Sequence, residues 1–433
     1  MHKRIKQEIH LRDLVVLARP TNDWLKTAPP LGVAFCLMIY YFTIFFQALL
    51  SFYSTIPFLD YGSLYASVYA WSHHLNPYLD YPLTSHPELG IRGLFVHAVN
   101  LNPPICLYLF RPIVAFGPIA SVELWTLVSV CLFCISLILV IRANPNPALR
   151  TRILMTLGMA GVWYTFQYGQ IYMILLFLTA VAWWSFKKND LVIAGISIGI
   201  LCALKPDFLV WPALLVLARH WRAGISAILT FATVSMVPLV FGDGVRLYGQ
   251  WLTACNHFNG IELPGNSAII AMFMRFDPYL GIPHNFRDIG FAVTIAFLLA
   301  IAWCVWRKGP DVFRTSEVAL VVSVLAGPVS WVGYTVVFIP MLYEKRLNSL
   351  MRVGWVLLCI PFPTVIWTAL ISPMHFALMG SPYFYGIALI GITLIYDLYR
   401  EQTNRQTLSK AELSVPDIPA RLEAGGLVVG EER

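Results

Sequence analysis

Apolar stretches of roughly 18 or more residues recur along the chain, and this feature limits the possible folds more than any other. A stretch of that length is long enough to cross a bilayer as a helix. Composition agrees, because 58% of the 433 residues are hydrophobic, 12% are charged and the mean hydropathy is +0.68. A soluble protein would carry about 25% charged residues. The sequence therefore predicts an all-α protein that spans the membrane many times.

We expect about twelve spans, each near the ~20 residues that a bilayer requires or somewhat shorter. The predicted spans are 31–53, 120–141, 153–168, 170–186, 190–204, 206–218, 223–241, 286–306, 315–329, 332–344, 351–371 and 383–399. They divide the chain into a cytoplasmic segment (1–30), a membrane domain (31–399) and a polar cytoplasmic tail (400–433) that we expect to be disordered. The charged start, "MHKRIKQEIHLRDLVVLARPTNDWLK", does not resemble a cleaved signal peptide.

Basic residues indicate how these spans are oriented, because cytoplasmic loops of membrane proteins carry an excess of Lys and Arg. With the spans above, 24 of the 30 Lys and Arg residues fall on one side, which we assign to the cytoplasm. The exceptions are Arg92, Arg111, Lys205, Arg246, Arg275 and Arg287. The net charge of +7 is thus better explained by membrane topology than by binding to nucleic acid.

The first outer loop, 54–119, contains two apolar segments that we do not expect to cross the membrane. Segment 102–118, "NPPICLYLFRPIVAFGP", is short and carries Arg111 at its centre. An arginine at mid-bilayer depth costs at least ~2.5–3.5 kcal/mol, so we expect a helix in the outer interface. The second segment, "YGSLYASVYAWSHHLNPYL", places Leu64, Val68 and Trp71 on one helical face, which predicts an amphipathic interfacial helix.

Five further polar side chains interrupt the apolar pattern on the predicted outer side. They are Arg111, Gln170 in "YGQIY", Lys205 in "LCALKPDFL", and His257 and Asn266 in "HFNGIELPGNSAIIAMFMRF". Polar groups gathered on one face of a membrane bundle indicate a site. Each also has a structural alternative: Gln170 satisfies backbone groups at a turn, Lys205 and Arg111 snorkel, Asn266 caps a helix, and His257 lies at the interface.

Asp60 is the strongest candidate for a catalytic group. The stretch "FLDYGSLYASVYAW" (58–71) follows the first apolar run and holds this single acid. With the orientation above, Asp60 lies on the outer side, where the bilayer meets water, at the start of the predicted amphipathic helix. A carboxylate that merely flanks a helix is the alternative interpretation.

Six stretches of the chain resemble, in the same order, the motifs of one known family. "LDYGSLYASVYAW" resembles D-x-x-x-Y-x-x-A; "NLNPPICLYLFRPIVAFGP" resembles "YPPLFALLLAPLALLP"; "YGQIYMILL" resembles "GQVNLLLL"; "AGISIGILCALKPDFLVWPALL" resembles "AGLLLGLAAALKPTPLLLLLYLL"; "PGNSAIIAMF" resembles "GNQSLxGLL"; and "LAGPVSWVGYTVVFIP" resembles "SPLSWxHHYVLLLP". The family that these motifs resemble is glycosyltransferase family 87, a family of polyprenyl-phosphate-mannose-dependent α-mannosyltransferases in the GT-C superfamily. The resemblance covers roughly residues 30–345. Gly333 and Tyr334 depart from it, because the family usually has histidine after S-W.

The resemblance implies a GT-C bundle with juxtamembrane helices in the periplasmic loop after the first span. It also implies an inverting transfer of a hexose, mannose in this family, from a polyprenyl-phosphate donor to a lipid or glycan acceptor. The active site would face the periplasm from a bacterial inner membrane. No cofactor or metal is expected, and no paired acids or histidine cluster lie near Asp60 in the sequence.

On this interpretation Asp60 is the general base, because a carboxylate can accept the proton of an attacking sugar hydroxyl. Lys205 holds the departing phosphate, with Arg111 as a second candidate and Arg275 as a weaker one. A further set serves substrate binding: Gln170 and Asn266 orient sugar hydroxyls, Tyr65 stacks on a sugar or anchors the loop, and His257 or His375 replaces the missing histidine.

Three other functions remain open from the sequence. A carrier or flippase would show charges at mid-bilayer depth and repeated halves. A lipid-linked glycan ligase or polymerase would use a large outer loop with arginines that hold a diphosphate. An assembly subunit without catalysis would fit the missing histidine.

Overall fold

The structure is a computed structural model that describes residues 39–40, 59–79, 99–144, 149–277, 285–344 and 347–413. Within these ranges the chain forms helices joined by turns and loops, and one isolated bridge pairs Asn266 with Trp331. The predicted all-α architecture is therefore confirmed for this part of the chain. The first predicted span, 31–53, lies almost wholly outside the described residues.

From the amino-terminal side, the helices are α3 (Leu59–Ser72), α4 (Pro104–Val114), α5 (Pro118–Ala143), α6 (Leu149–Leu157), α7 (Ala160–Tyr168), α8 (Tyr172–Lys187), α9 (Leu191–Leu204), the 3-10 helix η3 (Pro206–Leu209), α10 (Val210–Leu217), α11 (Trp221–Phe241) and α12 (Gly244–Asn256). They continue with α13 (Ile269–Met274), α15 (Asn285–Lys308), α16 (Val312–Ala326), the 3-10 helix η4 (Val332–Phe338), α17 (Ile339–Glu344), α18 (Ser349–Leu358), α19 (Phe362–Ala369), α20 (Pro373–Met379) and α21 (Pro382–Leu413).

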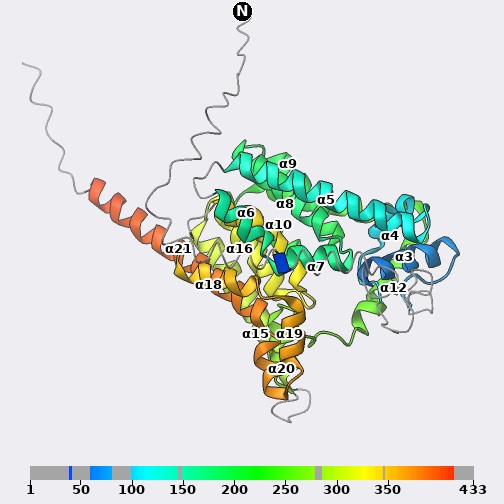
Figure 1. Cartoon of the computed structure of the whole chain (residues 1–433). Helices are drawn as coiled ribbons and strands as arrows, with labels where there is room; N and C mark the ends of the chain where they lie inside the picture. Colours follow the sequence, from blue (N-terminus) through cyan, green and yellow to red (C-terminus); the bar gives the residue numbers. More distant parts are fainter. Residues whose placement is uncertain are drawn as a thin grey trace, which may run out of the picture.

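The long helices pack side by side, and the short ones gather at their ends (Figure 1). α8 lies between α5 and α9, and α11 packs against the other side of α9. α3, α4 and α12 gather at one end of this group, on the right in Figure 1, although α12 lies far from α3 in the sequence. The chain thus brings an early helix, α3, close to segments that follow it by more than a hundred residues.

Four described segments are long and apolar enough to cross a membrane: Pro118–Ala143, Trp221–Phe241, Phe286–Lys308 and Pro373–Arg400. A fifth results if α18 and α19, which bend by 80° at their junction, form one broken span. The remaining apolar helices, such as α8 and α9, are shorter. The chain is therefore a multi-pass membrane protein, and the number of twelve spans stays a prediction.

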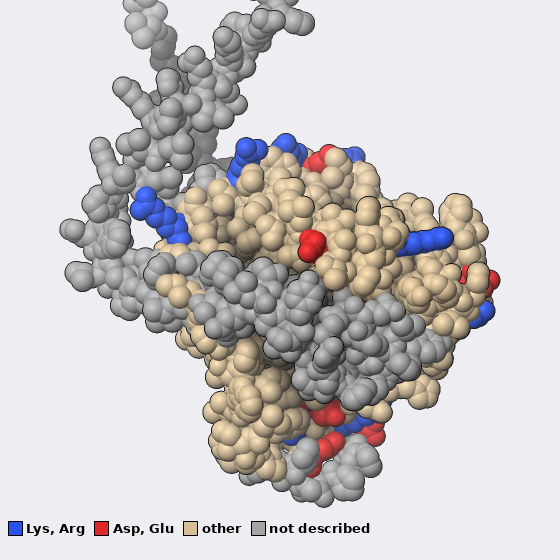
Figure 2. Space-filling model, turned by 45° about the vertical axis from the view of Figure 1, so that its right-hand side comes forward, with Lys and Arg blue, Asp and Glu red and all other residues tan. Residues whose placement is uncertain are grey.

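The outer surface of the bundle agrees with a lipid environment. Phe241 in α11, Leu299 in α15 and Trp367 in α19 are 75%, 66% and 74% exposed. Figure 2 shows Lys and Arg side chains along the upper edge of one face, above a broad surface with few charges. Extended apolar surface is unusual on soluble monomers and is expected of a protein that faces lipid.

Charged contacts join helix ends at the side of the bundle that we predicted to be cytoplasmic. Lys187 at the end of α8 places its Nζ 2.6 Å from Oε1 of Glu344 at the end of α17. Nη1 of Arg314 in α16 lies 3.6 Å from Oδ2 of Asp397 in α21. Each pair joins residues that the predicted topology places on the same side of the membrane.

Both helices predicted in the outer loop form, but only one of the two predictions is correct in full. α4 forms within the segment 102–118, as expected. α3 also forms, but the expectation of an amphipathic helix is wrong, because Tyr61, Leu64 and Val68 are all buried, and so are their neighbours on the other faces. α3 packs on α4 and α7, so protein covers it nearly all round. At the other end of the chain, α21 continues to Leu413, past the boundary predicted at 399.

Two glycines allow α9 to approach α11 closely. A Cβ atom on Gly195 would lie 2.5 Å from the carbonyl oxygen of Ala223, and one on Gly199 would lie 2.5 Å from that of Ala227. Small residues spaced by four positions are a common means of close helix contact in membranes. α9 ends directly before Lys205, so this contact also determines where Lys205 stands.

We predict that Gly195→Val lowers the melting temperature of the purified protein in detergent, because the added atoms push α9 away from α11. Overpacking of this kind costs about 1–3 kcal/mol. Ile196→Val is the control, since Ile196 is 40% exposed on the outer face of the same helix. Equal melting temperatures for both variants would contradict the close contact.

Candidate active site

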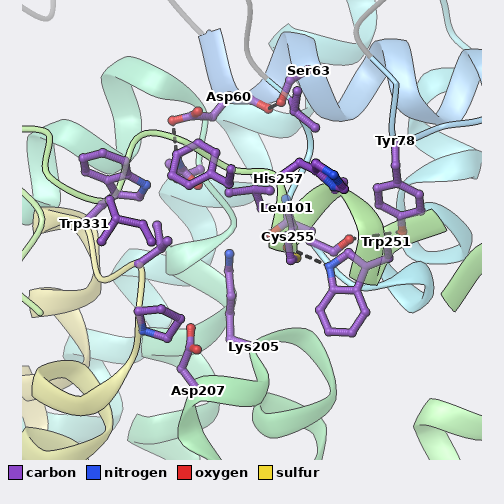
Figure 3. Close-up of a pocket in the computed structure, with 18 of the residues that line it drawn as sticks. Asp60, Ser63, Tyr78, Leu101, Lys205, Asp207, Trp251, Cys255, His257 and Trp331 are labelled. Atoms are coloured by element: carbon purple, nitrogen blue, oxygen red, sulfur yellow. Dashed lines mark hydrogen bonds between the residues drawn. The ribbon is translucent and has the colours of Figure 1, made fainter. Parts of the chain in front are cut away.

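A cavity of about 1320 Å³ lies where several helix interruptions meet. Its wall comes from α3, the break between α9 and α10, α12 with the loop that follows it, the segment 328–334 and the start of α19 (Figure 3). Broken helices leave backbone polar groups without intrahelical partners. A membrane protein tolerates such groups only where protein or water satisfies them. The cavity is thus the polar interior toward which these breaks converge.

Local sequence explains where the helices break. Gly169 ends α7 with φ +66°, a left-handed conformation that glycine adopts readily, and Gln170 follows at once. Pro206 cannot continue the hydrogen bonding of α9, so the helix ends before Lys205. Gly327 ends α16, and Pro328 follows it. Each of these signals is visible in the sequence.

Asp60 and Gln170 form the hydrogen bond at one side of the cavity. Nε2 of Gln170 donates to Oδ2 of Asp60, and both residues line the cavity (Figure 3). Burial raises the pKa of the Asp60 carboxyl from its ordinary value of 3.8 to about 6. The hydrogen bond from Gln170 and the positive charge of Lys205 act in the opposite direction. The carboxylate is therefore available as a proton acceptor near neutral pH.

Lys205 enters the cavity from the opposite side. Figure 3 shows its side chain extending from the helix break toward the space between Asp60 and His257. Its Nζ lies 5.7 Å and 5.6 Å from the ring centroids of Tyr172 and Tyr334. A carboxylate and an ammonium thus face one cavity, and the described structure shows no salt bridge between them.

A third wall carries aromatic and amide groups that the sequence analysis did not single out. Nε1 of Trp251 in α12 donates to the carbonyl oxygen of Leu101 (3.0 Å), and the hydroxyl of Tyr78 donates to the carbonyl oxygen of Asn102 (3.2 Å). Aromatic rings with polar edges suit the recognition of sugars. No local motif marks Trp251, because α12 lies within a segment that we assigned only to an outer loop.

Asp207 was also missed, although it stands two residues after Lys205 in the same break. Its carboxylate lines the cavity, and its Oδ2 accepts a hydrogen bond of 3.0 Å from the hydroxyl of Tyr334. Tyr334 in turn occupies a position where the resemblance led us to expect histidine. The "KPD" tripeptide could have signalled this acid, but its partner lies 127 positions away.

The structure brings four of the proposed site residues together: Asp60, Gln170, Lys205 and His257 all line the cavity. His257 stands near the centre of the view in Figure 3, and its Nδ1 lies 2.8 Å from the carbonyl oxygen of Thr253. Five other proposed residues are not among the residues that line it: Tyr65, Arg111, Asn266, Arg275 and His375.

Arg111 and Tyr65 lie elsewhere for reasons that their helices explain. Arg111 is exposed on α4, with its guanidinium carbon 5.4 Å from the ring centroid of Trp71. That position agrees with the snorkelling alternative. Tyr65 is 8% exposed and belongs to the buried part of α3, which agrees with an anchoring role.

Asn266 connects two segments of the cavity wall without lining the cavity itself. Its Nδ2 donates to the carbonyl oxygens of Ile261 and Pro328 at 2.9 and 3.1 Å. Its Oδ1 accepts from the backbone N–H groups of Ala268 and Ser330 at 3.1 and 2.9 Å. The side chain is 1% exposed and its hydrogen-bonding capacity is used by the protein, which leaves nothing for a sugar.

Arg275 acts on the same loop and does not line the cavity. It is fully buried, and its guanidinium donates to the carbonyl oxygens of Leu263 and Asn266 and to Oγ of Ser381 at 3.0, 2.9 and 2.8 Å. It therefore ties the loop after α12 to the start of α21 and does not reach a phosphate in the cavity. Within the described ranges, no group of three His, Cys, Asp or Glu side chains is placed to hold a metal ion.

Comparison with known families decides the class of protein. A model of glycosyltransferase family 87 matches residues 100–332, more than half of the 433 residues. The chain belongs to glycosyltransferase family 87. It is therefore a membrane glycosyltransferase, and the resemblance that the motifs indicated is confirmed at the level of the family. No curated protein matches the chain. The family 87 match includes Gln170, Lys205 and His257, whereas Asp60 lies before it. The cavity and the hydrogen bond from Gln170 connect Asp60 with the matched region.

We predict that Asn266→Leu destabilises the protein by about 3 kcal/mol or more, because it leaves several buried backbone groups without partners, and each such group costs about 1–3 kcal/mol. Thermal unfolding in detergent measures the loss. Asn256→Leu is the matched control, since Asn256 is exposed at the end of α12 and does not line the cavity. A melting temperature of Asn266→Leu equal to that of the control would contradict the connecting role.

Proposed function

We propose that this family 87 enzyme transfers a hexose from a polyprenyl-phosphate donor to a lipid or glycan acceptor at the outer face of a bacterial inner membrane. Mannose is the sugar that the resemblance favours. The transfer inverts the anomeric centre, and Asp60 is the general base. The observation that carries the proposal is the single cavity in which the Asp60 carboxylate and the Lys205 ammonium face the same space.

Asp60 suits the base because its environment adjusts its proton affinity. A sugar hydroxyl is a poor nucleophile, and a carboxylate in hydrogen-bond contact accepts its proton as the new bond forms. A pKa of about 6 leaves Asp60 mostly deprotonated at pH 7 while making it a stronger base than an exposed aspartate. Gln170 fixes one carboxylate oxygen, which leaves the other for the acceptor hydroxyl.

Lys205 suits the leaving group. When the bond between the anomeric carbon and the phosphate oxygen breaks, the electron pair stays with the phosphate, whose negative charge increases. An ammonium in a cavity enclosed by protein stabilises that charge more strongly than one at an open surface. Attack from the side of Asp60 and departure toward Lys205 place base and leaving group on opposite faces of the sugar, which produces inversion.

The apolar wall of the cavity supports a lipid-borne donor. Phe362 and Ile366 in α19 line the cavity, whereas Trp367 and Ile371, on and just after the same helix, are 74% and 65% exposed on the outside. A prenyl chain between this wall and the bilayer would keep its hydrocarbon in an apolar environment while the phosphate stands near Lys205. We further propose that the cavity opens to the periplasm, because the clustered charges at Lys187 and Glu344 lie at the other ends of α8 and α17.

We predict that Asp60→Asn lowers the transfer rate by about 10²–10⁴-fold, the usual contribution of a general base. Membranes that contain the protein would receive a polyprenyl-phosphate donor with radiolabelled mannose, and label in lipid or glycan products would be counted. Asp243→Asn is the control, because the Asp243 side chain is 74% exposed and does not line the cavity.

Two results would overturn the proposed function. Wild-type rates in Asp60→Asn would remove Asp60 as the base. Label that crosses the membrane without entering a new glycosidic bond would indicate a carrier.

The pH dependence provides a separate prediction. Because the base must be deprotonated, the rate should rise with pH through about 6 and level off above it. Gln170→Leu removes a hydrogen bond that favours the charged carboxylate, so the pKa of Asp60 should rise and the acid limb should move to higher pH. A pH–rate profile with saturating donor measures this, and a limb that stays in place or moves to lower pH would contradict the assignment.

A further inference from the structure

Two aromatic rings lie close to the Lys205 ammonium. Within the described part of the chain, no hydrogen bond or salt bridge holds its Nζ. The rings of Tyr172 and Tyr334 are the groups in contact with it, with centroids 5.7 Å and 5.6 Å away. A cation within about 6 Å of an aromatic face is attracted by the ring quadrupole, and the attraction increases when both are desolvated.

The two rings are themselves held in place. Tyr172 and Tyr334 are 1% and 2% exposed, and their centroids lie 4.7 Å apart. The ring of Tyr334 stacks on Phe208 with an interplanar angle of 17°. The hydroxyl of Tyr334 donates a hydrogen bond to the carboxylate of Asp207, the acid nearest to Lys205 in sequence. The lysine therefore has a rigid aromatic contact, and Tyr334 holds one oxygen of the neighbouring Asp207 carboxylate.

Gly333 provides the space for this arrangement. A Cβ atom on Gly333 would come closer than 3.0 Å to Cδ2 and Cε2 of the Tyr172 ring, an approach that real Cβ atoms essentially never make. It would also lie 3.3 Å from Cδ1 of Tyr164, so two aromatic rings crowd a side chain at this position. Position 333 must lack a side chain as long as Tyr172 is present.

We propose that Tyr172 and Tyr334 form an aromatic seat, a pair of rings that holds the Lys205 ammonium in the cavity, and that Gly333 is the residue that lets the seat close. Tyr172 is a positioning residue, because it acts on substrate through Lys205. A ring attracts the ammonium without neutralising its charge, whereas a carboxylate partner would compete with an anionic ligand. The consequence for a phosphate ligand rests on the proposed function; the packing of Gly333 against Tyr172 does not.

The packing is tested by a double-mutant cycle on melting temperature. Gly333→Ala should lower the melting temperature clearly in the wild-type background and much less in a Tyr172→Ala background, because the smaller residue removes the clash. Gly354→Ala is the matched control: it places a Cβ 2.7 Å from the carbonyl oxygen of Gly386, and neither residue lines the cavity, so Tyr172→Ala should not relieve its cost. Equal losses from Gly333→Ala in both backgrounds would overturn the seat.

The action on Lys205 is tested with farnesyl phosphate, a short prenyl phosphate, by titration calorimetry on the purified protein in detergent. Tyr172→Leu should weaken its binding about 2- to 30-fold, which is the range that one cation–π contact supplies. Tyr172→Phe keeps the ring and should restore most of that loss. Farnesol, which lacks the phosphate, should bind equally to all three proteins.

Lys205→Met separates failure of this inference from failure of the proposed function. If Lys205→Met leaves farnesyl phosphate binding unchanged, the phosphate role of Lys205 is wrong, and the stability cycle still decides the packing. If Lys205→Met weakens binding but Tyr172→Leu does not, the aromatic seat is wrong while the phosphate role stands. Equal weakening by Tyr172→Leu and Tyr172→Phe would also contradict the seat, because the ring would then be irrelevant.

Discussion

Backbone hydrogen bonding in a membrane is the constraint on which this structure depends. A helix that ends inside a membrane bundle leaves polar groups that lipid cannot satisfy. The chain breaks helices at Gly169–Gln170, Lys205–Pro206 and Gly327–Pro328, and all three breaks reach one cavity. The cost of the breaks is thus confined to a place where polar groups are useful, and the same breaks supply the side chains of the candidate site.

The polar groups of the cavity divide into those that remain available and those that the protein uses. Asp60 keeps one carboxylate oxygen free of Gln170, and the Lys205 ammonium contacts rings rather than an acid. Asp207 and Asn266 are engaged by Tyr334 and by backbone groups. A base and a cation that do not neutralise each other are what a transfer from a phosphate donor requires, since one must take a proton while the other meets a negative charge.

Membership of family 87 and the cavity support the same class of function from independent directions. The family match covers residues 100–332 and says nothing of Asp60. The cavity joins Asp60 to Gln170, Lys205 and His257 inside the match. Where the chain departs from the family pattern, at Gly333 and Tyr334, the structure shows close packing against Tyr172 rather than an empty place.

The sequence by itself determined the all-α membrane architecture, the helix breaks and four of the cavity residues, because apolar length, proline, glycine and isolated charges act locally and are visible in a single stretch of chain. Tertiary structure alone decided that α3 is buried, that Asn266 and Arg275 stand behind the wall, and that Trp251, Asp207 and Tyr172 join the site. Gln170 meets Asp60 across 110 positions, and Tyr334 meets Asp207 across 127. Such contacts depend on how distant helices pack, which no local pattern of residues encodes.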